Sequence, residues 1–138
     1  MGTRFALEVN MASNHHRHQV LLIDDDEDTR GGVAELMRMD GCEVVEAADG
    51  AEALAMLRTG WRPCVMLLDL NMPGMSGWEF REQQRRDRRI AHVPVVVLSG
   101  HCDLEQQARI LHLAAFLAKP VDVGQLLATI ERTCRLAA

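Results

Sequence analysis

Chemically useful side chains follow several short apolar runs of this 138-residue chain. In chain order they are Asp24 and Asp25 after Val20–Ile23, Asp69 after Val65–Leu68, Ser99 after Val93–Leu98, and Lys119 after Ala115–Ala118. Continuous apolar runs of this length are typical of strands that are buried on both faces of a parallel sheet. Because the carboxyl ends of parallel strands lie at one edge of the sheet, we expect these five side chains to converge.

Three carboxylates beside one lysine would give this edge an excess of negative charge. Two carboxylates about 4 Å apart repel each other by roughly 4 kcal/mol at an effective dielectric constant of about 20. A divalent cation relieves this repulsion, and Mg²⁺ prefers carboxylate, carbonyl, water and phosphate oxygens. An aspartate in such a site can accept a phosphoryl group as an acyl phosphate. The metal, the lysine and the serine hydroxyl would then stabilise the phosphoryl oxygens.

Helical patterns separate the apolar runs and predict how these residues are positioned. The segment Glu43–Ala47 alternates like a further strand, and Gly41 is well placed to end the helix before it. Predicted helix N-caps are Asp49, Ser76, Asp103 and Asp122. Five strand–helix units predict a parallel sheet with helices on both faces, since crossover connections are right-handed.

The composition excludes several classes of protein. Apolar residues make up 48% and charged residues 25%, which is the usual globular mix, and the formal net charge is −5. No apolar run is long enough to span a membrane, and the negative charge argues against nucleic acid as the main partner. The four cysteines form no Cys-x-x-Cys pair. We therefore interpret them as buried or idle thiols in a cytoplasmic protein, rather than as disulfides or zinc ligands.

Four blocks of the sequence resemble the receiver domain of two-component response regulators. They are Val20–Arg30, Leu67–Gly77, Val97–Gly100 and Phe116–Pro120, and the resemblance covers roughly residues 18–136. The pattern and the resemblance together predict an α/β fold, the doubly wound, flavodoxin-like (βα)5 sandwich with strand order 2-1-3-4-5. We expect residues 1–18 to form a flexible N-terminal extension, residues 19–138 to form the receiver domain, and no effector domain to follow.

The resemblance also implies a role for each residue at the expected site. Asp69 would be the phosphoacceptor, and Ser99 and Lys119 would contact the phosphoryl group. The Mg²⁺ ligands would be Asp25 and Asp69, with Asp24 acting mainly through a water and Asn71 through its backbone carbonyl. Ser99 and Phe116 would form the switch, and Lys119–Pro120 would be a cis bond. The implied function is phosphorelay signalling, in which Asp69 accepts a phosphoryl group from a phosphohistidine. The chain would catalyse only its own phosphorylation and dephosphorylation.

The implied partners are proteins. The donor would be a sensor histidine kinase or a histidine phosphotransfer protein. A downstream protein would bind the face made by the helix beginning at Asp103, the strand Ala115–Ala118 and the helix beginning at Asp122. We expect no direct contact with nucleic acid or membrane, and a monomer or a phosphorylation-dependent dimer. The connection Leu113–Phe116 is about two residues shorter than the family pattern, so we expect this face to differ in shape from that of the family.

The acidic residues after the first predicted strand allow two other interpretations. A small phosphatase would use Asp24 as the nucleophile and Asp26 as the acid/base, and a receiver-shaped binding module would never turn over phosphate. An EF-hand loop beginning at Asp24 is rejected, because Thr29 stands where a glycine is needed.

The arginines of residues 81–89 are expected to face water near a helix C-terminus. His101 and His112 are expected to face solvent as well.

Overall fold

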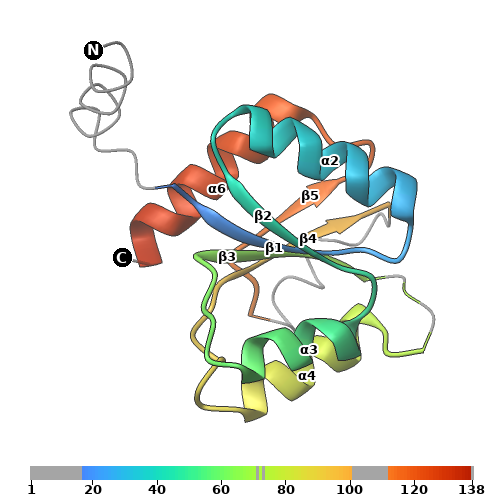
Figure 1. Cartoon of the computed structure of the whole chain (residues 1–138), viewed down its shortest axis with the longest axis vertical. Coiled ribbons are helices and arrows are strands. Elements are labelled where there is room, and N and C mark those ends of the chain that lie inside the picture. Colours follow the sequence, from blue (N-terminus) through green and yellow to red (C-terminus); the bar gives the residue numbers. More distant parts are fainter. Residues whose placement is uncertain (1–16, 71, 73, 101–111, 138) are drawn as a thin grey trace.

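A five-stranded parallel sheet forms the centre of the molecule (Figure 1). The computed structural model describes residues 17–70, 72, 74–100 and 112–137. The strands are β1 (Gln19–Ile23), β2 (Glu43–Ala47), β3 (Val65–Asp69), β4 (Val95–Ser99) and β5 (Ala115–Ala118). Their order is β2-β1-β3-β4-β5, so the predicted fold class and strand order are confirmed. Strand β4 begins two residues later than predicted, after Pro94.

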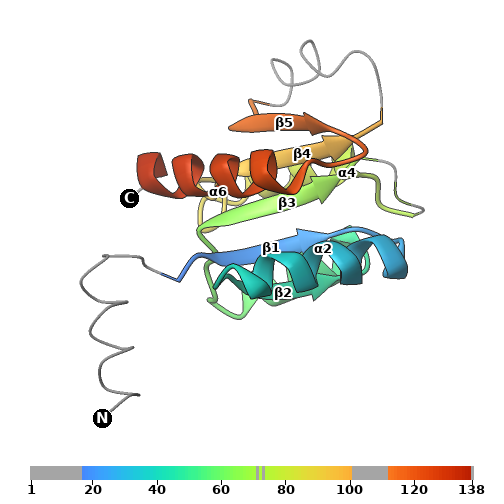
Figure 2. The same cartoon turned by 90° about the horizontal axis from the view of Figure 1, so that it is seen from above.

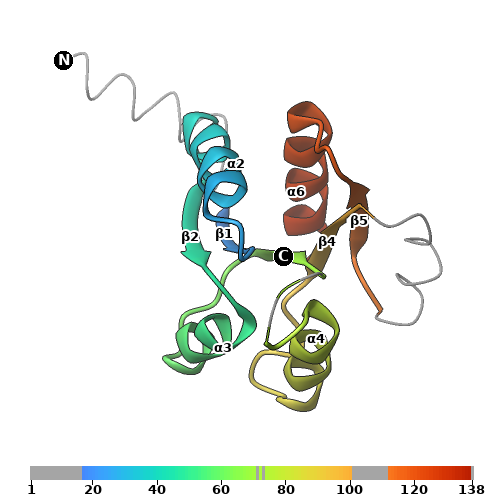
Figure 3. The same ribbon diagram turned by 90° about the vertical axis from the view of Figure 1, so that its right-hand side faces the viewer.

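Helices cover both faces of the sheet, as Figures 2 and 3 show. Helices α2 (Glu27–Met39) and α6 (Val123–Ala137) lie on one face, and α3 (Gly50–Arg58) and α4 (Gly77–Arg86) lie on the other. Alternate residues of each strand enter two separate cores. In β1, Leu21 packs into the core beneath α3 and α4, and Leu22 packs into the core beneath α2 and α6. This two-sided burial explains the continuous apolar runs.

Side-chain caps fix where the helices begin. The predicted caps Asp49 and Ser76 accept hydrogen bonds from the backbone N–H groups of Glu52 and Glu79, at 2.8 and 3.2 Å. Asp122 caps α6 in the same way through Gln125. Gly41, with φ of +95°, follows the end of α2 as predicted. The helix predicted to begin at Asp103 lies outside the described residues.

The prediction for Arg81 is wrong, because its guanidinium group is buried rather than facing water. It donates to the side chain of Gln84 and, at 2.7 Å, to the carbonyl oxygen of His112. Gln84 in turn donates to the carbonyl oxygens of Ile90 and Val93, both at 2.9 Å. Burial lowers the pKa of Arg81, and the positive charge of Arg85 lowers it further. The network ties α4 to the segments that lead into β4 and β5.

The prediction that His112 faces solvent is confirmed, since the residue is exposed; its φ of 52° lies in the left-handed region. His101 lies outside the described residues. Cys42, Cys64 and Cys134 are free thiols, while Cys102 is not among the described residues. None of the helices in the described ranges is long and apolar enough to cross a membrane.

Candidate functional site

Three carboxylates meet at the carboxyl edge of the sheet, where β1 and β3 end. Oxygen atoms of Asp24, Asp25 and Asp69 all lie within 4.8 Å of one another. Asp24 and Asp69 are buried, at 2% and 7% exposure, whereas Asp25 is exposed. The Lys119 ammonium nitrogen lies 3.6 Å from Asp24 Oδ2 and 3.5 Å from Asp69 Oδ2. One lysine therefore bridges two buried carboxylates, and the cluster keeps a net negative charge.

The backbone around Asp24 is held by hydrogen bonds. Asp24 Oδ1 accepts from the backbone N–H of Asp26 at 2.9 Å. The Arg30 guanidinium group donates to the Asp24 carbonyl oxygen at 2.7 Å and pairs with Glu46 of β2 at 3.1 Å. Arg30 was not predicted as a site residue, and its position in the first turns of α2 is the only signal for it in the sequence. These contacts orient the carboxylate of Asp24 toward Asp69 and Lys119.

Gly77 permits the chain to fold back closely behind Asp69. A Cβ atom at this position would lie 2.6 Å from the Asp69 carbonyl oxygen and 2.7 Å from the Leu70 Cα atom. The Gly77 N–H donates to the Leu70 carbonyl oxygen at 3.1 Å, just where α4 begins. Only glycine fits this approach without moving the backbone that carries Asp69. Gly77 is thus a second positioning residue that the sequence reasoning missed.

Ser99 and Phe116 lie on the two strands at the far side of the site. Ser99 is fully buried at the end of β4, and its carbonyl oxygen accepts a hydrogen bond from the Lys119 N–H at 3.0 Å. Phe116 in β5 is 37% exposed, so its ring is partly turned to solvent. The Lys119–Pro120 bond is cis. Asn71, the predicted backbone ligand, lies outside the described residues.

Asp26 acts as the N-cap of α2 rather than as a member of the cluster. Its Oδ1 accepts from the N–H groups of Asp28 and Thr29, and its Oδ2 accepts from the Thr29 hydroxyl at 2.9 Å. The Thr29 hydroxyl hydrogen bond is the main cause that lowers the pKa of Asp26. Both oxygens of Asp26 are engaged, which argues against the acid/base role that the phosphatase interpretation assigns to it.

An apolar cavity of about 520 Å³ adjoins the acidic cluster. Asp24 and Lys119 form part of its wall, together with apolar residues of α2 and α6 and of the turn after β5, among them Val33, Leu36 and Val121. The charged groups therefore lie at the boundary between water and an apolar surface, where their electrostatic interactions are less screened than in bulk solvent.

The family model for the response regulator receiver domain matches residues 20–131. The chain belongs to the response regulator receiver domain family. It is 34% identical to the transcriptional regulatory protein PrrA of Mycobacterium tuberculosis over 119 residues, covering 85% of this chain and 50% of PrrA. It is 30% identical to the phosphate regulon transcriptional regulatory protein PhoB of Escherichia coli, with 85% and 52% covered.

Solved receiver structures share the fold. The chemotaxis response regulator CheY4 of Vibrio cholerae is 32% identical, with a TM-score of 0.77 and coverage of 86% of this chain and 99% of CheY4. The chain spans about half the length of the transcriptional regulators that it matches. The similarity to them lies in the receiver domain, which is the signalling part identified by the family model, and is consistent with phosphorelay signalling.

Proposed function

We propose that this receiver domain accepts a phosphoryl group on Asp69 and returns it to water, so that its signal is self-limiting. The convergence of Asp24, Asp25 and Asp69 with Lys119 is the single observation that supports this assignment. We assign the nucleophile to Asp69, because it ends the central strand β3 and its carboxylate lies beside the other two carboxylates and 3.5 Å from the Lys119 ammonium nitrogen. Asp24 lies equally near the lysine, and its Oδ1 accepts a hydrogen bond from the Asp26 N–H.

The proposed reaction is an in-line phosphoryl transfer from a phosphohistidine. A carboxylate oxygen of Asp69 forms a bond to phosphorus while the bond from phosphorus to the donor imidazole nitrogen breaks. The Lys119 ammonium group stabilises the transferred oxygens, and the Ser99 hydroxyl donates to another of them. Attack by water on the acyl phosphate then restores the Asp69 carboxylate and releases inorganic phosphate.

The donor set fits Mg²⁺. Asp24, Asp25 and Asp69 offer oxygen atoms only, and one of the three is exposed, which suits a cation that retains several waters. We assign direct coordination to Asp25 and Asp69, a water-mediated contact to Asp24, and the remaining protein ligand to the backbone carbonyl of Asn71. When bound, the cation would neutralise the oxygens of the phosphoryl group.

The proposed output is a change at the surface around β5. Movement of Ser99 toward the phosphoryl group would leave room for the half-exposed ring of Phe116 to turn inward. This would alter the face that β5 and α6 are expected to form with the helix predicted to begin at Asp103. We assign a downstream protein partner to this face, and a monomer or a phosphorylation-dependent dimer as the oligomeric state. We propose a histidine kinase or a histidine phosphotransfer protein as the donor and the cytoplasm as the location. We propose no direct contact of this domain with nucleic acid, although PrrA and PhoB are transcriptional regulators.

Labelling with acetyl phosphate tests the proposal. The protein is incubated with acetyl phosphate and Mg²⁺ and is then separated on a phosphate-affinity gel. We expect a shifted band that Asp69→Asn abolishes, that chelation of Mg²⁺ prevents, and that Asp28→Asn leaves unchanged.

The same assay distinguishes the alternatives. A binding module would give no shifted band under any of these conditions. Release of inorganic phosphate is measured beside the gel. A phosphatase that used Asp24 as the nucleophile would lose this release with Asp24→Asn and keep it with Asp69→Asn, whereas the proposed receiver loses it with Asp69→Asn. Either result would contradict the assignment of Asp69.

A further inference from the structure

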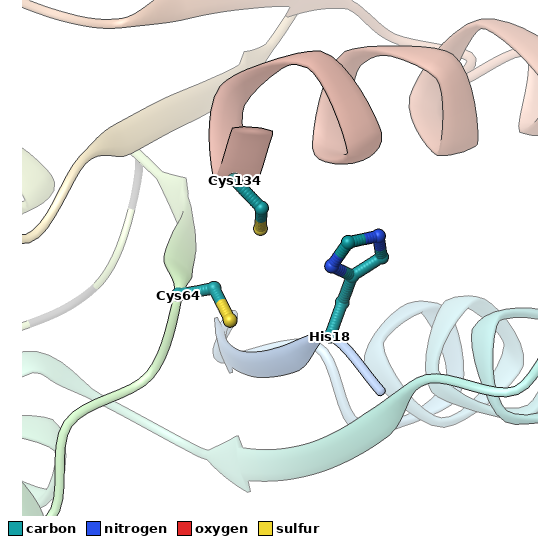
Figure 4. Close-up of side chains that lie close together, drawn as sticks. All are labelled: His18, Cys64 and Cys134. Atoms are coloured by element: carbon teal, nitrogen blue, oxygen red, sulfur yellow. The ribbon is translucent and has the colours of Figure 1, made fainter. Parts of the chain in front are cut away.

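A second cluster of metal-binding side chains lies at the opposite edge of the sheet. His18, Cys64 and Cys134 come from segments far apart in the sequence, yet an imidazole nitrogen and the two sulfur atoms lie within 4.8 Å of one another. Figure 4 shows the three side chains directed toward one shared space. Cys134 is buried, whereas Cys64 and His18 are partly exposed, so the cluster is reached from solvent on one side.

The fold holds these side chains in place through the backbone. His18 directly precedes β1, Cys64 directly precedes β3, and Cys134 lies in the last turns of α6. The Cys64 N–H donates to the Gln19 carbonyl oxygen at 2.7 Å, and the Glu43 N–H donates to the His18 carbonyl oxygen at 2.9 Å. The parallel register that pairs Val20 with Val65 therefore also brings His18 and Cys64 together.

The chemistry of the three ligands differs from that of the acidic cluster. Thiolate and imidazole ligands favour Zn²⁺ over Mg²⁺. A tetrahedral zinc with bonds of about 2.3 Å to sulfur and about 2.0 Å to nitrogen holds two sulfur ligands about 3.8 Å apart and a sulfur and a nitrogen about 3.5 Å apart. Both separations lie below the 4.8 Å within which the three ligand atoms are found. In addition, the Gln19 N–H donates to Cys64 Sγ at 3.5 Å, a contact that helps to hold the sulfur in place.

We propose that His18, Cys64 and Cys134 bind one zinc ion, with a water molecule in the fourth position. Each thiol gives up its proton to solvent on coordination, so that two thiolates balance the charge of the ion. The ion would join β1, β3 and α6 at the edge remote from Asp69. This revises the interpretation of the cysteines as idle thiols.

Cobalt substitution tests the site in the full-length, reduced protein. Co²⁺ bound by thiolates gives a charge-transfer absorption in the near ultraviolet that neither a histidine tail nor a carboxylate cluster produces. We expect this absorption to saturate at one Co²⁺ per chain and to disappear when Zn²⁺ is added. Cys64→Ser and Cys134→Ser should weaken binding by more than about 100-fold, since even partners outside the first coordination shell are worth 10–100-fold. His18→Gln should weaken it as well.

Matched controls separate the site from its surroundings. Cys42→Ser removes a nearby buried thiol and should leave the absorption intact, as should the double substitution His15→Ala/His16→Ala. Circular dichroism of each metal-free variant checks that it is folded. Absence of the absorption in excess Co²⁺, its retention in Cys64→Ser, or its loss in the His15/His16 variant would each overturn the proposal. So would a Cys64–Cys134 disulfide in the isolated protein together with no thiolate absorption after reduction.

Discussion

The two edges of the sheet carry different kinds of polar group. At the carboxyl edge, carboxylate oxygens of Asp24 and Asp69 lie 3.6 and 3.5 Å from the Lys119 ammonium nitrogen, so the side chains gathered there are charged groups of the kind that bind a cation or a phosphoryl group. At the amino edge, Arg81 and Gln84 donate to backbone carbonyls, and the sulfurs of Cys64 and Cys134 lie close to the imidazole of His18. Strand β1 separates the two edges by five residues, roughly 16 Å at about 3.3 Å per residue.

The difference has a physical origin. Helix N-termini and strand ends meet at the carboxyl edge, where backbone N–H groups favour anions such as phosphate. Helix C-termini and strand starts meet at the amino edge, where unpaired carbonyl oxygens need donors. Arg81 and Gln84 supply such donors, and their buried polar groups are satisfied in return. One edge is therefore arranged for chemistry, and the other mainly for structure.

The largest expected effect is that the two edges bind different ligands independently. Asp69→Asn should abolish acetyl phosphate labelling and leave the cobalt–thiolate absorption unchanged. Cys134→Ser should abolish the cobalt–thiolate absorption and leave acetyl phosphate labelling unchanged. Both assays, run on both variants, test whether the two edges bind their ligands independently. Loss of phosphorylation in Cys134→Ser with native circular dichroism would show that the edges are coupled.

The next effect is on stability at the carboxyl edge. Gly77→Ala should destabilise the protein by about 3 kcal/mol, the upper range for overpacking, because the new Cβ meets backbone atoms that cannot move aside. Gly32 lies on the exposed side of α2, and a Cβ atom at this position would meet no other atom within 4 Å. Gly32→Ala should therefore stabilise the folded protein by about 0.5–1 kcal/mol. Urea unfolding measures both. Equal effects at the two positions would contradict the close approach behind Asp69.

At the amino edge, Gln84→Leu should cost about 2 kcal/mol. The carbonyl oxygens of Ile90 and Val93 lose a donor, and the Arg81 guanidinium loses an acceptor, inside the protein. The neighbouring exposed residue gives the control, since Gln83→Leu should change the free energy of unfolding by no more than about 0.5 kcal/mol. Similar values for the two variants would mean that the buried network contributes little.

The smallest effect concerns the cap beside the acidic cluster. The pKa of Asp26 is lowered from its ordinary 3.8, first by the hydrogen bond from the Thr29 hydroxyl. Its stabilisation is therefore present above pH 3.8 and is lost as the pH falls through the lower folded-state pKa. Asp26→Asn should make thermal stability fall less steeply on that acid side, as followed by melting curves. Asp28→Asn is the control. If the melting temperatures of Asp26→Asn fell with acid as steeply as those of the unchanged protein, Asp26 would not contribute to the acid sensitivity.

Local signals predicted most of the helices and strands, and the family resemblance added the strand order, whereas the burial of the Arg81 charge could not be predicted. The runs at β1 and β3 and the caps Asp49 and Ser76 are local, so their structure follows from a few neighbouring residues. The prediction for Arg81 was wrong because the local sequence around it says nothing about the carbonyl of His112, which lies 31 residues further along the chain.

The same distinction separates the two clusters. The aspartates follow strands whose shared direction could be inferred, so their convergence was predictable. His18, Cys64 and Cys134 are individually unremarkable in the sequence, and only the register of β1 with β3 and the path of α6 unite them.

The hydrogen bond from Arg81 to the carbonyl of His112 also limits how the segment around β5 can move. β5 begins three residues later and is only four residues long, with Phe116 in its middle and Lys119 just beyond its end. Its start is fastened to α4 and its end to the Ser99 carbonyl. Because both ends of this short segment are held by hydrogen bonds, we expect β5 to keep its position when Asp69 is phosphorylated. The conformational change should then reach the surface through rotation of the Phe116 ring.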